Sequence, residues 1–156
     1  MRSLVLLMGI LLIYSCEVRP TPEPVRFGKD QCAFCRMAIV DAGFASELKT
    51  KKGKVYKFDA IECLAAFYLS GKIPKQEVLA IWVSDYKQKK FIRAETAYYL
   101  ISPNVRSPMG LSIAAFEKKE DLEEALSVFK GKTTDWNGVL EYVGEKWKEK
   151  ISVKLH

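Results

Sequence analysis

The sequence predicts an α+β domain made of two ββα units, with a mainly antiparallel sheet and helices packed on one face. Two observations lead to this fold class. The order strand, strand, helix occurs twice, over residues 44–71 and 98–131, as a weak duplication of order rather than a sequence repeat. In each unit a glycine, Gly71 or Gly131, follows the helical pattern directly, at the position where many helices end.

The first unit opens with a predicted hairpin. Residues alternate in polarity over 44–48 and again over 55–58, and a Gly-containing turn separates the two runs. Asp59, with Glu62 three residues later, then predicts an N-cap and its capping-box partner. We therefore expect a helix from about Ala60 to Ser70, with Cys63 in its first turn.

The remaining elements follow from apolar runs and helical spacing. The nearly unbroken apolar run 78–83 predicts a strand buried on both faces. A helix should begin after Asp135 as N-cap, and the polar tail from Lys148 should fray. We further expect strands over 91–93, 97–101 and 111–116 and a helix over 120–130.

The first 29 residues have the composition of an export signal and a tether. Residues 1–15 combine one basic residue with a short apolar run, which is typical of a signal peptide. Ile13-Tyr14-Ser15-Cys16 is similar to a bacterial lipobox, whose Cys is lipidated after cleavage; a plain hydrophobic anchor and an ordinary secretory signal are the alternatives. We expect residues 16–29 to be a lipid-anchored Pro-rich tether, 30–145 the folded domain and 146–156 a polar C-terminal tail. The domain would then face the periplasm from a membrane of the bacterial envelope.

The charge and histidine content argue against several functions. The net charge of +6 comes from lysines spread along the chain, without the aromatic and basic patch of a nucleic-acid-binding surface. His156 is the only histidine and lies at the C-terminus. The sequence therefore argues against a Ser-His-Asp or Cys-His catalytic arrangement and against a His-rich zinc site.

Sulfur is concentrated in residues 32–37, where Cys32, Cys35 and Met37 occur within six positions. A Cys-x-x-Cys pair can bind a metal, work as a redox pair or form a disulfide. With Cys16 assigned to lipidation, three cysteines remain, and this odd number favours a functional thiol over a purely structural framework. Met37 is either a thioether ligand or the first apolar residue of the core. Met109 is a second candidate ligand because it lies in a Pro/Gly loop that offers no helix or strand face to bury it.

Cys63 and Asp59 have two interpretations each. A thiol at a helix N-terminus has a lowered pKa, which suits a metal ligand or an attacking sulfur, but Cys63 fits equally well as a small buried hydrophobe. Asp59 is best interpreted as the helix cap, and its carboxylate could also lie near a bound metal.

Taken together, these motifs resemble the NosL family. The resemblance rests on Cys32-x-x-Cys35-x-Met37, on Gly53-Lys54-x-Tyr56-x-Phe58-Asp59-x-Ile61-x-Cys63 and on Pro108-Met109-Gly110, and it covers about residues 30–142. It implies a copper-binding lipoprotein that delivers Cu(I) for the maturation of nitrous oxide reductase and works with a membrane copper transporter. It also implies a pair of ββα units similar to the fold of organomercurial lyase.

Carried over to this sequence, the family's Cys-x-Met motif matches Cys35 and Met37, and the Met before Gly matches Met109. Arg36 stands where Gly is common in the family, no His lies near the motif, and Cys32 takes the place of such a donor. We therefore expect a Cu(I) chaperone, not an enzyme, with Cys35, Met37, Met109 and Cys32 as ligands and Cys63 and Asp59 as further candidates. The expected partners are a copper ion, an apo-cuproenzyme such as nitrous oxide reductase, the transporter and the lipid bilayer.

Two other functions compete with this expectation. The chain could be an enzyme, either a thiol-disulfide oxidoreductase or a lyase, that uses Cys32, Cys35 and Cys63. Alternatively, Cys32 and Cys35 could form a disulfide that staples a structural lipoprotein.

Overall fold

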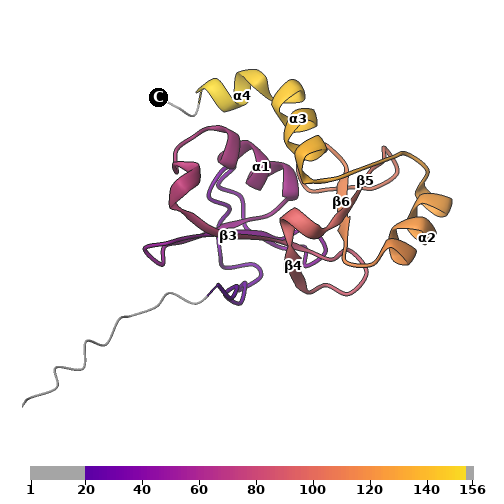
Figure 1. Ribbon diagram of the computed structural model, residues 1–156, viewed down its shortest axis with the longest axis horizontal. Coiled ribbons are helices and arrows are strands. Elements are labelled where there is room, and N and C mark those ends of the chain that lie inside the picture. The colour runs from indigo at the N-terminus through magenta and orange to yellow at the C-terminus, as the bar shows by residue number, and fades with distance from the viewer. Residues whose placement is uncertain (1–19, 154–156) are drawn as a thin grey trace, which may run out of the picture.

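The computed structural model describes residues 20–153, which contain two units that both begin with the order strand, strand, helix, strand (Figure 1). The expected signal segment 1–15, the lipidation site Cys16 and His156 lie outside the described residues. Among residues 20–153, no helix is both long enough and apolar enough to cross a membrane.

The first unit is a four-stranded antiparallel sheet, with one helix between its second and third strands in the chain. β1 is the second strand in the sheet, hydrogen-bonded to β2 on one side and β3 on the other, and β4 follows β3 at the far edge. The predicted hairpin and the predicted buried strand are thereby confirmed, although the first strand begins two residues later than expected. The elements are β1 (Ser46–Thr50), β2 (Val55–Phe58), α1 (Ile61–Leu69), β3 (Val78–Ser84) and β4 (Phe91–Arg93).

The second unit repeats the topology of the first in a separate three-stranded sheet. Its first strand, β5, is again central, between β6 and β7, and both pairings are antiparallel. The predicted duplication is confirmed and extends to a fourth element, β7, which was not expected because its three polar residues show no apolar alternation. The elements are β5 (Tyr98–Ile101), β6 (Ile113–Phe116), α2 (Lys119–Phe129) and β7 (Lys132–Thr134).

Asp85 joins the two units directly after β3. Its backbone forms a parallel bridge with Ala115 of β6, and the N–H of Tyr86 donates to the carbonyl of Ala115 at 2.8 Å. The carboxylate of Asp85 accepts a hydrogen bond from the N–H of Glu117 at 2.7 Å and two more from the turn that follows it. This buried carboxylate thus fixes the second sheet against the first.

Two C-terminal helices cover α1 on the side opposite the first sheet (Figure 1). α3 (Trp136–Lys146) begins as predicted, because Oδ1 of Asp135 accepts a hydrogen bond from the N–H of Gly138 at 2.9 Å. We expected the chain to fray from Lys148, but it continues as α4 (Lys148–Val153). It does so because Ile151 packs against the core, which the polar composition of the segment did not indicate.

Part of the expected tether is held on the first sheet. The N–H of Glu23 donates to both carboxylate oxygens of Glu47 in β1, at 3.1 and 3.0 Å. Nζ of Lys57 in β2 donates to the carbonyl oxygen of Pro24 at 2.7 Å. Residues 23 and 24 therefore lie against the domain and are not part of a free spacer.

Candidate metal centre

Cys32 and Cys35 lie at the tip of a short hairpin that precedes β1. An antiparallel bridge between Gln31 and Ala38 forms the base of the hairpin. The N–H of Cys32 donates to the carbonyl of Met37 at 2.8 Å, and the N–H of Cys35 points to the sulfur of Cys32 at 3.4 Å. Because the chain folds back here, the sulfur atoms of Cys32 and Cys35 lie within 4.8 Å of each other.

Two other residues fix this tip to the domain, and a third, Arg36, shapes its turn. The N–H of Ala33 donates to the carbonyl of Lys57 in β2 at 2.8 Å. The ring of Phe34 stacks on Trp147, with ring centroids 6.0 Å apart and an interplanar angle of 7°. Arg36 has a φ of 71°, in the left-handed region that favours glycine, so the turn adopts a shape that Gly would take without strain.

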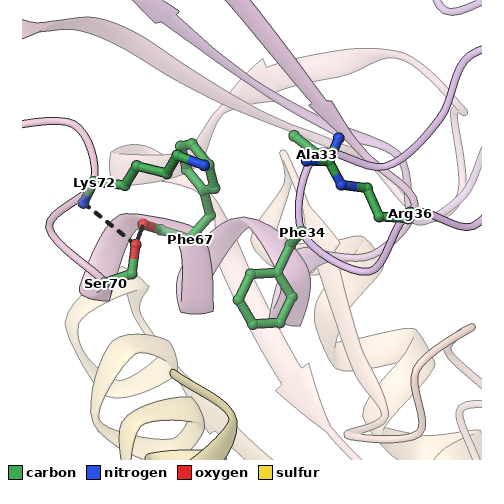
Figure 2. A pocket seen from close by; sticks show the side chains of 6 residues that line it. All are labelled: Ala33, Phe34, Arg36, Phe67, Ser70 and Lys72. Carbon is green, nitrogen blue, oxygen red and sulfur yellow. Dashed lines mark hydrogen bonds between the residues drawn. The ribbon is translucent and has the colours of Figure 1, made fainter. Parts of the chain in front are cut away.

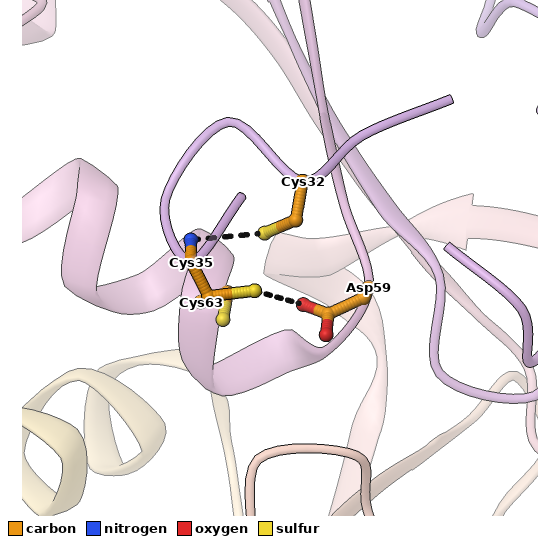
Figure 3. A group of neighbouring side chains, drawn as sticks. All are labelled: Cys32, Cys35, Asp59 and Cys63. Atoms are coloured by element: carbon orange, nitrogen blue, oxygen red, sulfur yellow. Dashed lines mark hydrogen bonds between the residues drawn. The ribbon is translucent and has the colours of Figure 1, made fainter. Parts of the chain in front are cut away.

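Three thiols and one carboxylate meet below the hairpin tip (Figure 3). The sulfur atoms of Cys32, Cys35 and Cys63 and one oxygen of Asp59 all lie within 4.8 Å of one another. Asp59 comes from the link between β2 and α1, and Cys63 from the first turn of α1. Cys32 and Cys63 are fully buried, whereas Cys35 is partly exposed. The structure thus brings together the two thiols of the hairpin and both of the less favoured candidates.

Asp59 does not cap α1, so the predicted capping box is wrong. Ala60 occupies the N-cap position with extended backbone and without a capping side chain. Instead, Oδ1 of Asp59 accepts a hydrogen bond from the thiol of Cys35 at 3.4 Å. The other expected member of the box, Glu62, accepts a hydrogen bond from the hydroxyl of Ser107. Tertiary partners therefore replace the local partners that the sequence pattern indicated.

The pKa values of the three thiols are shifted in opposite directions. A hydrogen bond from Cys63, supported by backbone N–H groups, lowers the pKa of Cys32 to about 6. Burial, together with the nearby charges of Cys32 and Asp59, raises the pKa of Cys35 to about 12. Donating to Cys32, as well as burial, raises the pKa of Cys63 far above its ordinary value, which is the reverse of the lowering that its place on the helix suggested. Negative charge on the metal-free thiols therefore concentrates on Cys32.

The two candidate thioether ligands occupy different surroundings. Met109 lines an open cavity of about 450 Å³ together with Cys35 and Phe34, and residues of α4 form its other wall. Met37 is not part of this lining and is 55% exposed at the surface. The structure thus places Met109, and not Met37, on the accessible side of the thiol cluster.

Phe34 also lines a second, smaller cavity of about 230 Å³ (Figure 2). This cavity lies between the hairpin tip and the C-terminal end of α1, with Arg36 and Lys72 among its lining residues. There the hydroxyl of Ser70 donates to the carbonyl of Phe67 at 2.7 Å. No thiol or thioether lines the second cavity, whereas Cys35 and Met109 line the first one.

Sequence reasoning missed Glu62 as a residue of this region. Glu62 is fully buried, and among the described residues its Oε2 atom has no hydrogen-bond partner. Burial raises the pKa of its carboxyl group. The signal was present in the sequence, because Glu62 is the only charged residue in α1, whose other residues are apolar around the whole helix apart from a Tyr hydroxyl.

The donor set of this cluster suits a soft metal ion. Thiolates and thioethers are soft ligands that select Cu(I), and three sulfur donors with a nearby thioether allow low coordination numbers. Three thiolates and a carboxylate also match the ligand types of Zn(II), which has little use for a thioether. The arrangement therefore fits a metal centre and gives Met109 a role only if the metal is soft.

Known proteins are similar to this chain in sequence and in fold. The chain is 26% identical over 127 residues to the copper-binding lipoprotein NosL of Stutzerimonas stutzeri, in a match that covers 74% of this chain and 65% of that protein. It therefore spans somewhat less than two thirds of that curated relative. Its fold is similar to the crystal structure of the copper chaperone NosL from Shewanella denitrificans, with a TM-score of 0.66 and 24% identity over 76% of this chain and 95% of the other.

The sequence profile of the NosL family matches residues 24–143, which include the hairpin tip, α1 and the Met109 loop. This match covers well over half of the chain and all the thiols of the cluster. The chain therefore belongs to the NosL family.

Proposed function

We propose that this protein is a lipid-anchored Cu(I) metallochaperone of the bacterial envelope that delivers copper to a cuproenzyme. The observation that carries the proposal is the convergence of three thiol sulfurs within 4.8 Å of one another, beside a cavity lined by Met109. The names of the two relatives, a copper-binding lipoprotein and a copper chaperone, support it.

The proposed ligands are the thiolates of Cys32, Cys35 and Cys63, with a thioether from the loop region. For the thioether, the geometry favours Met109 over Met37, because Met109 shares the cavity of Cys35 while Met37 is largely exposed. Asp59 supports the site through its hydrogen bond with Cys35, since a carboxylate is a hard donor and a poor ligand for Cu(I).

Release would proceed from the exposed side of the site. Two of the sulfurs, those of Cys32 and Cys63, are buried, whereas Cys35 faces the open cavity. A thiolate of the acceptor protein can approach copper through that cavity and displace the ligands one at a time. Transfer by ligand exchange requires no catalysis, and tight binding is then compatible with delivery.

The proposed location and partners follow the family resemblance. Lipidation of Cys16 would hold the domain at the membrane, with the residues before Glu23 as the spacer. The proposed client is nitrous oxide reductase or another cuproenzyme in its apo form, supplied in concert with a membrane copper transporter. Membrane fractionation of wild type and Cys16→Ala tests the anchor: the wild type should sediment with membranes and the variant should not.

Anaerobic titration of the reduced protein with Cu(I), in competition with a chromophoric chelator, tests the copper site. We expect one copper per chain, and a loss of affinity of about tenfold or more for Cys35→Ser and Cys63→Ser. Met109→Leu and Met37→Leu form a matched pair, because both remove a loop thioether and keep the side-chain size. Met109→Leu should weaken binding more than Met37→Leu.

Three results would contradict this proposal. The first is a wild-type protein that takes up no Cu(I). The second is a Cys63→Ser variant that binds Cu(I) as tightly as the wild type does. The third is a disulfide between two of the cluster's cysteines in protein isolated from its native compartment. That result would favour a structural or redox role instead.

A further inference from the structure

Glu62 is a buried carboxylate next to the thiol cluster that the proposed ligand set does not use. It follows Ile61 at the start of α1 and directly precedes Cys63. It is fully buried, although acidic side chains are almost never fully buried without partners. One oxygen, Oε1, accepts two hydrogen bonds, and the other has no partner among residues 20–153. A carboxylate buried in this way needs a structural reason, and the groups that donate to Oε1 supply it.

Both hydrogen bonds on Oε1 come from the loop that carries Met109. The hydroxyl of Ser107 donates to it from one end of the loop, and the N–H of Leu111 donates from the other end at 3.2 Å. Met109 lies between these two anchor points. The loop is thus pinned to α1 at both ends by a single oxygen atom.

The loop is also closed on itself, so the two anchor points fix its shape. The N–H of Gly110 donates to the carbonyl of Ser107 at 3.2 Å, and the N–H of Ser112 donates to the hydroxyl of Ser107 at 2.8 Å. Ser112 has a φ of 61°, in the left-handed region that non-glycine residues rarely adopt. A strained backbone persists where surrounding contacts hold it, and here Ser107 and Glu62 supply them.

We propose that Glu62 is a positioning residue: it ties the loop 107–111 to the first turn of α1, so that Met109 faces Cys35 across the cavity. This inference rests on the proposed function in so far as Met109 binds copper. Glu62 and Cys63 are consecutive residues in the first turn of α1. Cys63 supplies a proposed thiol ligand, and Glu62 positions the loop with the proposed thioether ligand. Glu62 itself contacts no copper.

A double-mutant cycle separates positioning from a general structural role. Purified full-length chain, reduced and anaerobic, is titrated with Cu(I) against a chelator for wild type, Glu62→Ala, Met109→Leu and the double variant. We expect Glu62→Ala to bind about tenfold more weakly, as loss of a residue that positions a ligand usually does. Met109→Leu should bind at least about tenfold more weakly, because it removes the proposed thioether ligand. The double variant should bind no more weakly than Met109→Leu alone, because Glu62 acts through Met109. Independent losses that multiply in the double variant would overturn the inference.

Two further variants guard against a Glu62→Ala chain that does not fold. The amide oxygen of Glu62→Gln can accept the same two hydrogen bonds, so this variant should keep its Cu(I) affinity within about threefold. Ser107→Ala removes one of these two hydrogen bonds, so its Cu(I) affinity should lie between those of Glu62→Gln and Glu62→Ala. Glu120→Ala, at the second position of α2 and exposed, is the matched control and should bind like wild type. A Gln variant as weak as Met109→Leu would overturn the inference.

A copper-free measurement distinguishes failure of the inference from failure of the proposed function. In reduced apo-protein, the alkylation rate of Cys35 reports access to the cavity that Cys35 and Met109 both line. Glu62→Ala should raise this rate at least about threefold and Glu62→Gln should leave it unchanged. An unchanged rate in Glu62→Ala would overturn the positioning role even if copper binding stands. A wild type that binds no Cu(I) but shows the expected alkylation pattern would overturn the proposed function and leave the loop assignment intact.

Discussion

The two ββαβ units share one topology, yet only the first contains the thiol cluster. In each unit the second and third strands flank the first strand, and the helix lies between these two strands in the chain. The helices differ in what covers them. Seven of the nine residues of α1 are buried, whereas only two of the eleven residues of α2, Leu122 and Ala125, are buried.

The difference is largest at the helix starts. The second and third residues of α1 are Glu62 and Cys63, which are fully buried, and neither helix has a side-chain cap. The third residue of α2 is Asp121, whose carboxylate forms an ion pair with Lys87 at 2.8 Å near the surface. The same position thus holds a thiol of the candidate metal centre in one unit and an ion-paired carboxylate in the other.

Topology alone does not create this site. What distinguishes α1 is that the hairpin tip with Cys32 and Cys35 lies against its first turn, while α3 and α4 cover its other side. The covering excludes water from Cys32 and Cys63, and this is the condition under which grouped thiols interact strongly. Substitutions at matched positions of the two units test this explanation.

The largest expected loss of stability concerns the fourth residue of each helix. Leu64 in α1 is fully buried in the main core, and Leu122 in α2 is 6% exposed in the smaller second cluster. We expect Leu64→Ala to lower the free energy of unfolding by about 3–4 kcal/mol and Leu122→Ala by about 2 kcal/mol, because a cavity closes less easily in the more enclosed site. Urea unfolding of the apo-protein measures both. Equal losses would contradict the difference in enclosure.

The next contrast concerns the second residue of each helix. Glu62→Ala leaves the Ser107 hydroxyl and the Leu111 N–H without their acceptor, and buried donors of this kind cost about 2–3 kcal/mol in stability. Glu120→Ala removes an exposed side chain and should cost less than about 1 kcal/mol. Chemical denaturation of both variants under identical conditions provides the comparison. If the two losses were the same, Glu62 would not be holding the loop.

Much of the fold could be predicted because it depends on local signals. The alternation over 55–58 matches β2, and Asp135 caps α3 as its side-chain type predicted. β7 and α4 could not be predicted in this way. The Lys-Thr-Thr segment forms strand β7 because it pairs with β5, and α4 forms because Ile151 packs against the core. Both are tertiary effects.

The candidate site was predictable in its residue types but not in its arrangement. The Cys-x-x-Cys pair and the loop Met109 could be singled out from composition and position. Asp59 looked like a helix cap, and only the fold shows its carboxylate accepting from Cys35. Asp59 and Glu62 have the residue types and the spacing of a capping box. In the fold, however, Asp59 accepts from Cys35 and Glu62 from Ser107, so partners distant in sequence replace the local ones.

A third contrast concerns the second residue of each central strand, Glu47 in β1 and Tyr99 in β5, both fully buried. Burial, opposed by a hydrogen bond from the Glu23 N–H, raises the pKa of Glu47 from 4.5 to about 7. A carboxyl group whose folded-state pKa is raised stabilises the fold below its unfolded pKa, and this contribution is lost as the pH rises through the folded-state pKa.

Stability should therefore fall between about pH 4.5 and pH 7, by roughly 2 kcal/mol on account of Glu47. Glu47→Gln has no ionisable group there, so this part of the decline should be absent from its profile. Urea unfolding at several pH values between 4 and 8 measures the difference. Parallel profiles for the wild type and the variant would show that Glu47 titrates as an exposed carboxylate does.

The smallest expected effect is that of Tyr99→Phe, which is the matched test in the second unit. The hydroxyl of Tyr99 donates to the carbonyl oxygen of Ala94 at 2.7 Å, and its loss should cost about 1 kcal/mol. Burial raises the pKa of Tyr99 well above 10, so the phenol stays protonated in both states from pH 4 to pH 8. The loss should therefore be the same across that range, whereas the effect of Glu47→Gln should change with pH. A pH-dependent loss for Tyr99→Phe would mean that a group titrating between pH 4 and pH 8 acts on the Tyr99 hydroxyl, and the contrast with Glu47 would not hold.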